Sequence, residues 1–192
     1  SEPLVALLGN PNCGKTALFN LLTGSRQKVA NYSGVTVERK EGRLTLSSGK
    51  NVRILDLPGA YSLYPRSLDE RVTCNVLTGR AEGEKRPDLV LCILSAVNLR
   101  RNLRLVLAAK RLGLPCVVVL NMLDIAQRQG LTIDTKALSK ELGLPVVTSV
   151  GIQTNGADGI KSFLAGLDWR DLNSLRTGTA EATLENVASH IA

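Results

Sequence analysis

The chain has 192 residues, of which 44% are hydrophobic, 21% charged and 3% aromatic, and its net charge is +7. This length and composition suit one α/β domain with a sizeable core. No apolar run approaches the roughly 20 residues of a membrane-spanning helix, and the first residues lack the regions of a signal peptide. We therefore expect the chain itself to be soluble.

The positive charge would suit nucleic acid, an anionic lipid surface or a nucleotide, and it does not choose among them. Basic residues gather at 100–111 on an expected helix, but no aromatic residues alternate with them, so no nucleic acid partner is expected. The four cysteines are widely spaced, which favours reduced thiols over a disulfide or zinc set. The single histidine, His190, argues against histidine catalysis or a histidine metal site.

The strongest functional signal is the stretch GNPNCGKT at residues 9–16, which follows an apolar run at 4–8 and opens a helical pattern. Its two glycines let successive backbone N–H groups turn toward one point, and the helix dipole adds positive charge there. We expect a phosphate-binding loop in which Lys15 reaches the outer phosphates and the Thr16 hydroxyl binds Mg2+. The alternative, a glycine-rich turn that holds nothing, is disfavoured by the strand before it and the helix after it.

The remaining elements alternate between strands and helices. In chain order we expect a loop at 25–37, a hairpin of strands at 39–47 and 51–57, a helix at 68–77, a charged loop at 79–87, a strand at 88–96, a helix at 98–112, a strand at 116–120, a helix at 135–142, a strand at 146–149 and a helix at 160–167. This order implies a mostly parallel sheet with one antiparallel hairpin, helices on both faces, and a ligand at the carboxyl ends of the strands.

Two further motifs follow the ends of expected strands. In DLPG at 56–59, Asp56 can hold Mg2+ and the Gly59 N–H can reach a terminal phosphate, although a turn-capping aspartate is the alternative. In NMLD at 121–124, Asp124 could accept hydrogen bonds from N1–H and the 2-amino group of guanine, while Asn121 ties this loop to the phosphate loop. Adenine lacks that donor pair, so the motif predicts guanine as the base.

The loop before the hairpin carries a candidate switch. The Thr36 hydroxyl, after Gly34 and Val35, could complete the Mg2+ shell when a third phosphate is present and release it afterwards. A strand-edge threonine is the alternative. A second mobile segment would start at Gly59. Backbone groups just after the last strand would contact the guanine edge, near Ser149, Val150, Gly151 and Ile152.

In this order and spacing, GNPNCGKT, GVTVE, DLPGAYSL and NMLD resemble the cytosolic N-terminal G domain of the bacterial ferrous iron transport protein B family, over about residues 3–167. The resemblance implies a three-layer P-loop GTPase fold at 1–167 that hydrolyses GTP to GDP and phosphate. It also implies a helical domain, begun by 168–192 in truncated or abbreviated form, and a transmembrane iron permease at the bacterial inner membrane, with the G domain on its cytoplasmic side. The family resemblance also allows small regulatory transport proteins as partners, and it allows the chain to form an oligomer.

The roles of the family carry over to matching positions. Catalysis is assigned to Asn12, Lys15, Thr36 and Gly59, and Mg2+ to Thr16, Thr36 and Asp56. The nucleotide contacts are Gly9, Asn10, Pro11, Asn12, Cys13, Gly14, Lys15, Thr16, Ala17, Gly34, Val35, Thr36, Asp56, Gly59, Asn121, Met122, Asp124, Ser149, Val150 and Gly151.

Three positions modify this assignment. Ala60 stands where many GTPases have the glutamine that orients the attacking water, so intrinsic hydrolysis should be slow. Asn12 is placed like the asparagine that helps bind K+ in potassium-activated GTPases, and K+ would supply the positive charge of an arginine finger. Alternatively, Asn12 hydrogen-bonds the loop to itself. Met122 replaces a lysine that packs over the base, which suggests modest affinity and fast exchange.

Two other functions stay open at this point. One is a free-standing K+-dependent GTPase acting on ribosomes or tRNA, which RNA binding that weakens steeply with salt would favour. The other is a nucleotide-sensing module with negligible hydrolysis. Turnover measurements would separate it from the transporter GTPase domain and from the free-standing GTPase.

Overall fold

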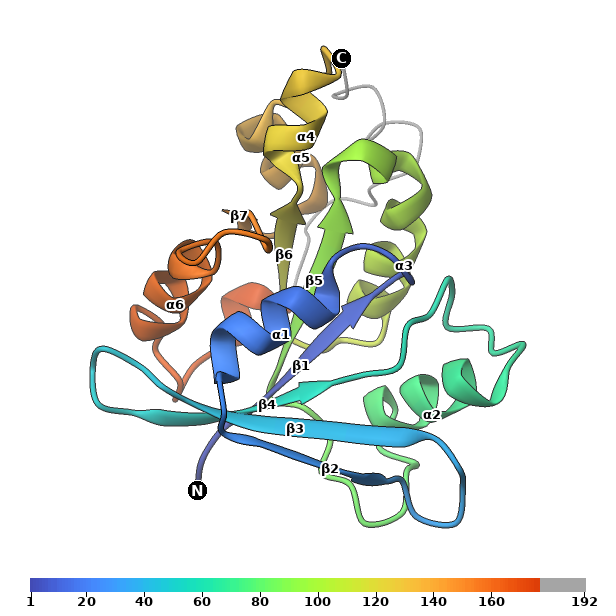
Figure 1. The fold of residues 1–192 in the computed structure, drawn as a ribbon. Coiled ribbons are helices and arrows are strands. Elements are labelled where there is room, and N and C mark those ends of the chain that lie inside the picture. The colour runs from blue at the N-terminus through green and yellow to red at the C-terminus, as the bar shows by residue number, and fades with distance from the viewer. Residues whose placement is uncertain (177–192) are drawn as a thin grey trace.

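A seven-stranded sheet with helices on both faces forms the core of the computed structural model, which describes residues 1–176 (Figure 1). The strands are β1 (Leu4–Gly9), β2 (Gln27–Asn31), β3 (Glu38–Thr45), β4 (Asn51–Asp56), β5 (Leu89–Ser95), β6 (Cys116–Asn121) and β7 (Val146–Ser149). The helices are α1 (Lys15–Thr23), α2 (Leu68–Leu77), α3 (Leu99–Arg111), α4 (Leu123–Arg128), α5 (Thr135–Leu142) and α6 (Asp158–Ala165), with 3-10 turns η1 (Ala96–Asn98) and η2 (Asn173–Leu175). Residues 177–192, which belong to the segment expected to begin a helical domain, lie outside the described residues.

The sheet order is β2-β3-β4-β1-β5-β6-β7, and all pairings from β4 to β7 are parallel. Strands β1, β5 and β6 are buried along their whole length, as expected where helices cover both faces. Side chains of β1 alternate between two cores: Leu4 joins α2, α3 and α5, whereas Val5 joins α1 and α6. The predicted α/β fold with a mostly parallel sheet is therefore confirmed.

Strand β2 lies inside the segment that the sequence predicts to be a loop. It pairs antiparallel with β3, from Gln27 opposite Gly42 to Asn31 opposite Glu38, and β3 pairs antiparallel with β4. The predicted β3–β4 hairpin is present, and β2 extends it to a third strand. Four of the five β2 residues are exposed, so no apolar alternation marks this edge strand in the sequence.

Side-chain caps define the starts of α2 and α5, whose bounds match the prediction. The Ser67 hydroxyl accepts a hydrogen bond from the Glu70 N–H (3.1 Å), and the Asp134 carboxylate accepts one from the Ala137 N–H (3.0 Å). Helix α4 was not predicted, because six residues give too short a pattern to recognise. Within residues 1–176, no helix has both the length and the apolar character needed to span a membrane.

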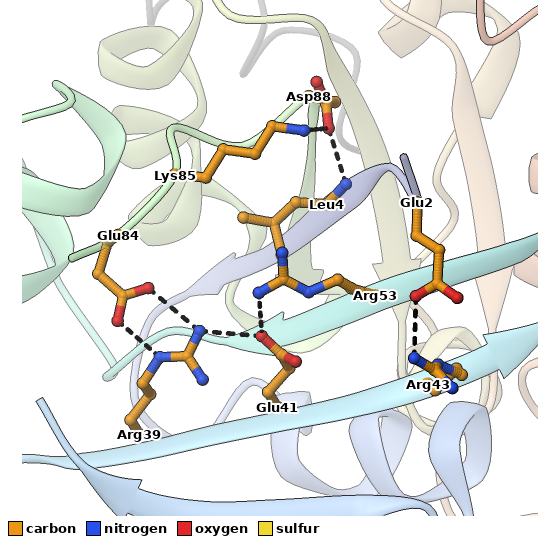
Figure 2. Close-up of polar contacts among 9 residues, drawn as sticks. All are labelled: Glu2, Leu4, Arg39, Glu41, Arg43, Arg53, Glu84, Lys85 and Asp88. Atoms are coloured by element: carbon orange, nitrogen blue, oxygen red, sulfur yellow. Dashed lines mark hydrogen bonds and ion pairs between the residues drawn. The ribbon is translucent and has the colours of Figure 1, made fainter.

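Ion pairs fix the charged connection between α2 and β5 to the sheet (Figure 2). Arg39 of β3 donates to both carboxylate oxygens of Glu84, at 2.6 and 3.1 Å, and to Glu41 at 2.9 Å. At the end of the same connection, Asp88 accepts a hydrogen bond from the Leu4 N–H at 2.7 Å. The connection is thus held against both β3 and the start of β1.

Candidate nucleotide-binding site

The phosphate loop joins β1 to α1, and its backbone alternates in handedness. Asn12 and Gly14 have left-handed φ values of 68° and 86°, whereas Cys13 between them does not. This alternation is the geometry of a nest, in which consecutive N–H groups converge on an anion. A Cβ at Gly14 would lie 2.3 Å from the amide nitrogen of Asn121, so both the φ value and the available space require glycine.

Lys15 and Asp56 form a buried ion pair at this loop. Lys15 Nζ donates to Asp56 Oδ1, and their side chains are only 10% and 4% exposed. Lys15 is the first residue of α1, and Asp56 is the last residue of β4, beside Leu7 of β1. The structure therefore places in direct contact the cation expected to bind phosphate and the carboxylate expected to bind Mg2+.

The donor set suits Mg2+ in company with a nucleotide. Among residues 1–176 there is no group of three or more histidine, cysteine, aspartate or glutamate side chains that could hold a metal alone. Thr16 and Asp56 offer two oxygen ligands, and Mg2+ is commonly bound by one or two protein oxygens together with substrate phosphates and water. A metal at this place would depend on phosphate oxygens for the rest of its shell.

The DLPG segment packs directly on the phosphate loop. The Ala60 N–H donates to the Gly9 carbonyl at 3.1 Å. A Cβ at Gly59 would lie 3.1 Å from Cγ of Pro11, which is tighter than most Cβ contacts. Glycine at this position lets the start of the second predicted mobile segment lie against the phosphate loop.

Glu70 of α2 anchors that second segment, a role the sequence analysis did not assign. Its buried carboxylate accepts hydrogen bonds from the N–H groups of Tyr61 (2.9 Å) and Arg66 (3.2 Å). The hydrogen bond from Tyr61 holds the pKa of the Glu70 carboxyl below its ordinary value of 4.5. Ser67 and Glu70 have the spacing of a capping box, which was a signal available in the sequence, but the contact with Tyr61 depends on the fold.

Glu70→Ala is expected to destabilise the chain by about 1–2 kcal/mol, since two backbone N–H groups lose a charged acceptor. Urea unfolding would measure this loss, and amide hydrogen exchange should accelerate at Tyr61 and Arg66. Because the pKa is lowered in the folded state, the wild-type advantage should hold at neutral pH and disappear as the pH falls below 4.5. The exposed neighbour Asp69 serves as control, and an equal effect of Asp69→Ala would contradict the anchoring role.

Asn121 connects three loops of the site. Its buried amide nitrogen donates to the Cys13 carbonyl at 3.1 Å, and its amide oxygen accepts from the Ser149 hydroxyl and the Gly151 N–H, each at 3.1 Å. The expected tie between the NMLD loop and the phosphate loop is present. The segment just after β7 joins the same side chain, so residues at or just beyond the ends of β1, β6 and β7 meet at one point.

The predicted base end of the site contains a buried carboxylate oxygen without a hydrogen-bond partner in the described part of the chain. Asp124 Oδ2 accepts a hydrogen bond from Arg128 at 2.9 Å, whereas the buried Oδ1 has no partner among residues 1–176. A buried carboxylate oxygen without a donor is costly, so a ligand donor would be favoured there. Met122 has a left-handed φ of 63°, and its sulfur accepts a hydrogen bond from the Ser95 hydroxyl at 3.5 Å.

A tight turn supports the segment after β7. The Val150 N–H donates to the Gly156 carbonyl at 3.0 Å, and the Gly156 N–H donates to the Gln153 carbonyl at 2.9 Å. A Cβ at Gly156 would lie only 1.6 Å from the Val150 oxygen, so no other residue fits. Sequence reasoning missed Gly156, although a glycine shortly after the last strand was a visible signal.

Thr36, together with Gly34 and Val35 in the same turn, lies apart from the other predicted site residues. It is exposed in the turn between β2 and β3, which Figure 1 shows at the bottom of the view, away from the loop between β1 and α1. The turn is closed by a hydrogen bond from the Tyr32 N–H to the Val37 carbonyl at 3.0 Å, and the Tyr32 ring is buried, which raises the pKa of its hydroxyl. In this conformation Thr36 does not join Thr16 and Asp56.

The remaining predicted residues lie at or beside the phosphate loop. Asn10 and Cys13 are buried there, and burial raises the pKa of the Cys13 thiol. The exposed Asn12 side chain forms no hydrogen bond with any other described residue. The alternative expectation, in which Asn12 hydrogen-bonds the phosphate loop to itself, is therefore not seen in this conformation. Ala17 lies in the first turn of α1.

Comparison with known proteins identifies relatives of this chain. A family model described as ferrous iron transport protein B matches residues 4–164. The Fe(2+) transporter FeoB of Escherichia coli K12 is 48% identical over 162 residues, which are 82% of this chain and 20% of that protein. The corresponding transporter of Salmonella typhimurium is 49% identical over the same shares of each chain. The chain thus spans about a fifth of the length of these curated relatives.

Solved structures agree with these matches. The cytosolic domain of L. pneumophila FeoB has a TM-score of 0.76 and 40% identity, over 84% of this chain and 66% of that one. The T. maritima FeoB cytosolic domain in its GMPPNP form has a TM-score of 0.77 and 37% identity, over 86% and 65%. A mutant of S. thermophilus NFeoB bound to mGDP has a TM-score of 0.78 and 41% identity, over 86% and 61%. The family match over residues 4–164, together with these identities, confirms the resemblance inferred from the motifs: this chain belongs to the ferrous iron transport protein B family.

Proposed function

We propose that this chain is the GTP-binding and GTP-hydrolysing regulatory domain of a membrane ferrous iron transporter. The observation that carries the proposal is the buried contact of Lys15 with Asp56 at the phosphate loop, joined through Asn121 to the free oxygen of Asp124. The charged groups for phosphate and metal lie at one end of the site, and a carboxylate that can accept hydrogen bonds from guanine lies at the other. The hydrogen bonds of Asn121 connect the two ends. Structural neighbours that contain GMPPNP or mGDP support this proposal.

At the phosphate end, Lys15 would exchange Asp56 for the outer phosphate oxygens, while the nest at Asn12–Gly14 would receive phosphate oxygens on its N–H groups. Thr16 and the released Asp56 carboxylate would hold Mg2+, which when bound neutralises phosphate charge. Helix α1 directs its positive end at the same place. When Lys15 and Asp56 separate, Lys15 would gain a phosphate oxygen and Asp56 would gain Mg2+, so each charge keeps a partner of opposite sign.

At the base end, Asp124 would accept from N1–H and the 2-amino group of guanine. Its Oδ1 is buried and without a donor among residues 1–176, so pairing removes an existing cost. Adenine presents an acceptor at the position of N1–H and would leave the carboxylate oxygen unpaired. Backbone groups of Ser149, Val150 and Gly151 would complete this end of the site.

The switch would act through two segments. The Gly59 N–H would bind the terminal phosphate from its position against Pro11. Thr36 would have to move from the β2–β3 turn to reach Mg2+, which means that Tyr32 must give up its buried packing. A GTP-dependent exchange between these two arrangements is the proposed signal to the remaining domains. Those domains, helical and transmembrane, would place this chain on the cytoplasmic side of the bacterial inner membrane.

Hydrolysis should be slow without K+, and K+ should accelerate it. Ala60 is fully buried and has no polar group to orient water, whereas the Asn12 side chain is exposed and free to bind a cation beside the phosphates. Phosphate release with Mg2+ present should be about tenfold faster in KCl than in NaCl at equal ionic strength, a change of about 1.4 kcal/mol in the barrier. Asn12→Ala should lose the stimulation while still binding GDP.

Equal and very slow release in both salts would overturn the proposed K+ activation. With GDP binding intact, that result would favour the second candidate, a nucleotide-sensing module with negligible hydrolysis. The observation that favours this candidate is Ala60, because nothing in the described part of the DLPG segment replaces the missing water-orienting side chain. Failure to bind GDP at all would remove both.

A further inference from the structure

The carboxylate of Asp124 is held by a neighbour on its own helix. Arg128 Nη2 donates to Oδ2 at 2.9 Å, one helical turn away, while Oδ1 is buried with no partner among residues 1–176. The Asp124 side chain is 24% exposed and the Arg128 side chain 72%. One oxygen is therefore paired with an exposed arginine, and the other is buried without a hydrogen-bond donor from the described residues.

The pair contributes little to stability. Exposed ion pairs one helical turn apart are screened by water and restrict two side chains, which offsets most of their attraction. Helix α4 has only six residues, so it is too short for such a pair to decide whether it forms. Because Asp124 lies in the first turn of α4, the pair instead bears on how the Asp124 carboxylate is oriented.

Aspartate in the first turn of a helix readily turns back and accepts hydrogen bonds from the free N–H groups of that turn. Asp124 makes no such bond to any described residue, and its Oδ2 is instead engaged by Arg128 at the other end of α4. A carboxylate has about four acceptor positions, so Oδ2 can keep Arg128 and still accept from a base. Arg128 thus leaves both oxygens able to face a pair of donors.

We propose that Arg128 is a positioning residue that fixes the Asp124 carboxylate for two-point pairing with the amidine edge of guanine. The inference rests on the proposed function and adds a determinant of base specificity to it. Without Arg128, the Asp124 carboxylate turns toward the α4 backbone. It can then accept a hydrogen bond from one donor of the base but not from two. The 2-amino group of guanine is then the contact that is lost.

Inosine nucleotides provide the matching probe, because hypoxanthine keeps N1–H and lacks the 2-amino group. Calorimetric titration of the 192-residue chain with GDP and with IDP, in Mg2+, would measure both affinities. Arg128→Ala should weaken GDP about fivefold, which corresponds to one net hydrogen bond, and IDP less than about twofold. The preference for GDP over IDP should therefore fall, and Arg128→Lys should restore most of it.

Lys85→Ala is the matched control, since it also removes an exposed ion pair, here with Asp88 at 2.8 Å. This pair lies before the start of β5, whereas the candidate site lies at the carboxyl ends of the strands. It should leave both affinities unchanged. Equal weakening of GDP and IDP by Arg128→Ala, no change, or tighter binding of GDP would each overturn the positioning role. Failure of the wild-type chain to bind GDP would instead overturn the proposed function, so the two failures are distinguishable.

Discussion

Lys15→Ala is expected to weaken guanine nucleotide binding by at least about a hundredfold, because it removes the side chain that would contact the outer phosphates. It should also destabilise the ligand-free chain by about 3–5 kcal/mol. The Asp56 side chain is only 4% exposed, so truncating its partner leaves a buried charge unpaired. Calorimetry with GDP and urea unfolding without nucleotide would measure the two effects separately.

A double variant separates binding from folding. Lys15→Met together with Asp56→Asn removes both charges while filling similar volume, so it should recover most of the lost stability. Nucleotide binding should stay lost, because the phosphate contact is still missing. Normal GDP affinity in Lys15→Ala would remove the assignment of residues 9–16 as a phosphate loop.

Asp124→Asn is expected to reverse the base preference from guanine toward xanthine. The new amide can accept from N1–H and donate to the oxygen that xanthine carries in place of the 2-amino group, whereas toward guanine it places donor against donor. GDP should weaken by about a hundredfold or more, and XDP should become the better ligand. Competition titrations with GDP and XDP would measure the change.

The control for this reversal is Asp134→Asn, because Asp134 is an exposed N-cap residue of α5 and asparagine caps a helix equally well. It should leave the base preference and the stability unchanged. Unaltered selectivity in Asp124→Asn would mean that the base is read by other groups, and the buried oxygen would need another explanation.

The predictable parts of the fold are those in which local pattern and tertiary burial agree. Helices α2 and α5 begin at capping residues, and the central strands are continuous apolar runs. Strand β2 escaped prediction because pairing with β3, rather than burial of its own side chains, makes it a strand. Sequence patterns report burial, and an exposed edge has none to report.

In the candidate site, the motifs identify groups whose place follows from a strand end or a helix start, such as Lys15 and Asp124. Contacts of residues outside the motifs were beyond reach, as with Glu70 and the Tyr61 N–H. Arg128 is different: it lies four residues after Asp124, so recognition of α4 would have predicted the pair. The place of Thr36 depends on the conformation of the β2–β3 turn, and no residue pattern in that turn specifies this conformation.

Asn121 also ties the site to the order in which the chain folds. Its bond to Cys13 closes a separation of 108 residues, and its bonds to Ser149 and Gly151 require β7 to be docked. Because these bonds join the first and last parts of the chain, we expect the complete site to form only once β1 and β7 are both in the sheet. A ligand that binds this site selects the completed fold and stabilises it by mass action. Refolding followed by nucleotide fluorescence should report the last step of assembly, whereas helix formation followed by circular dichroism should precede it.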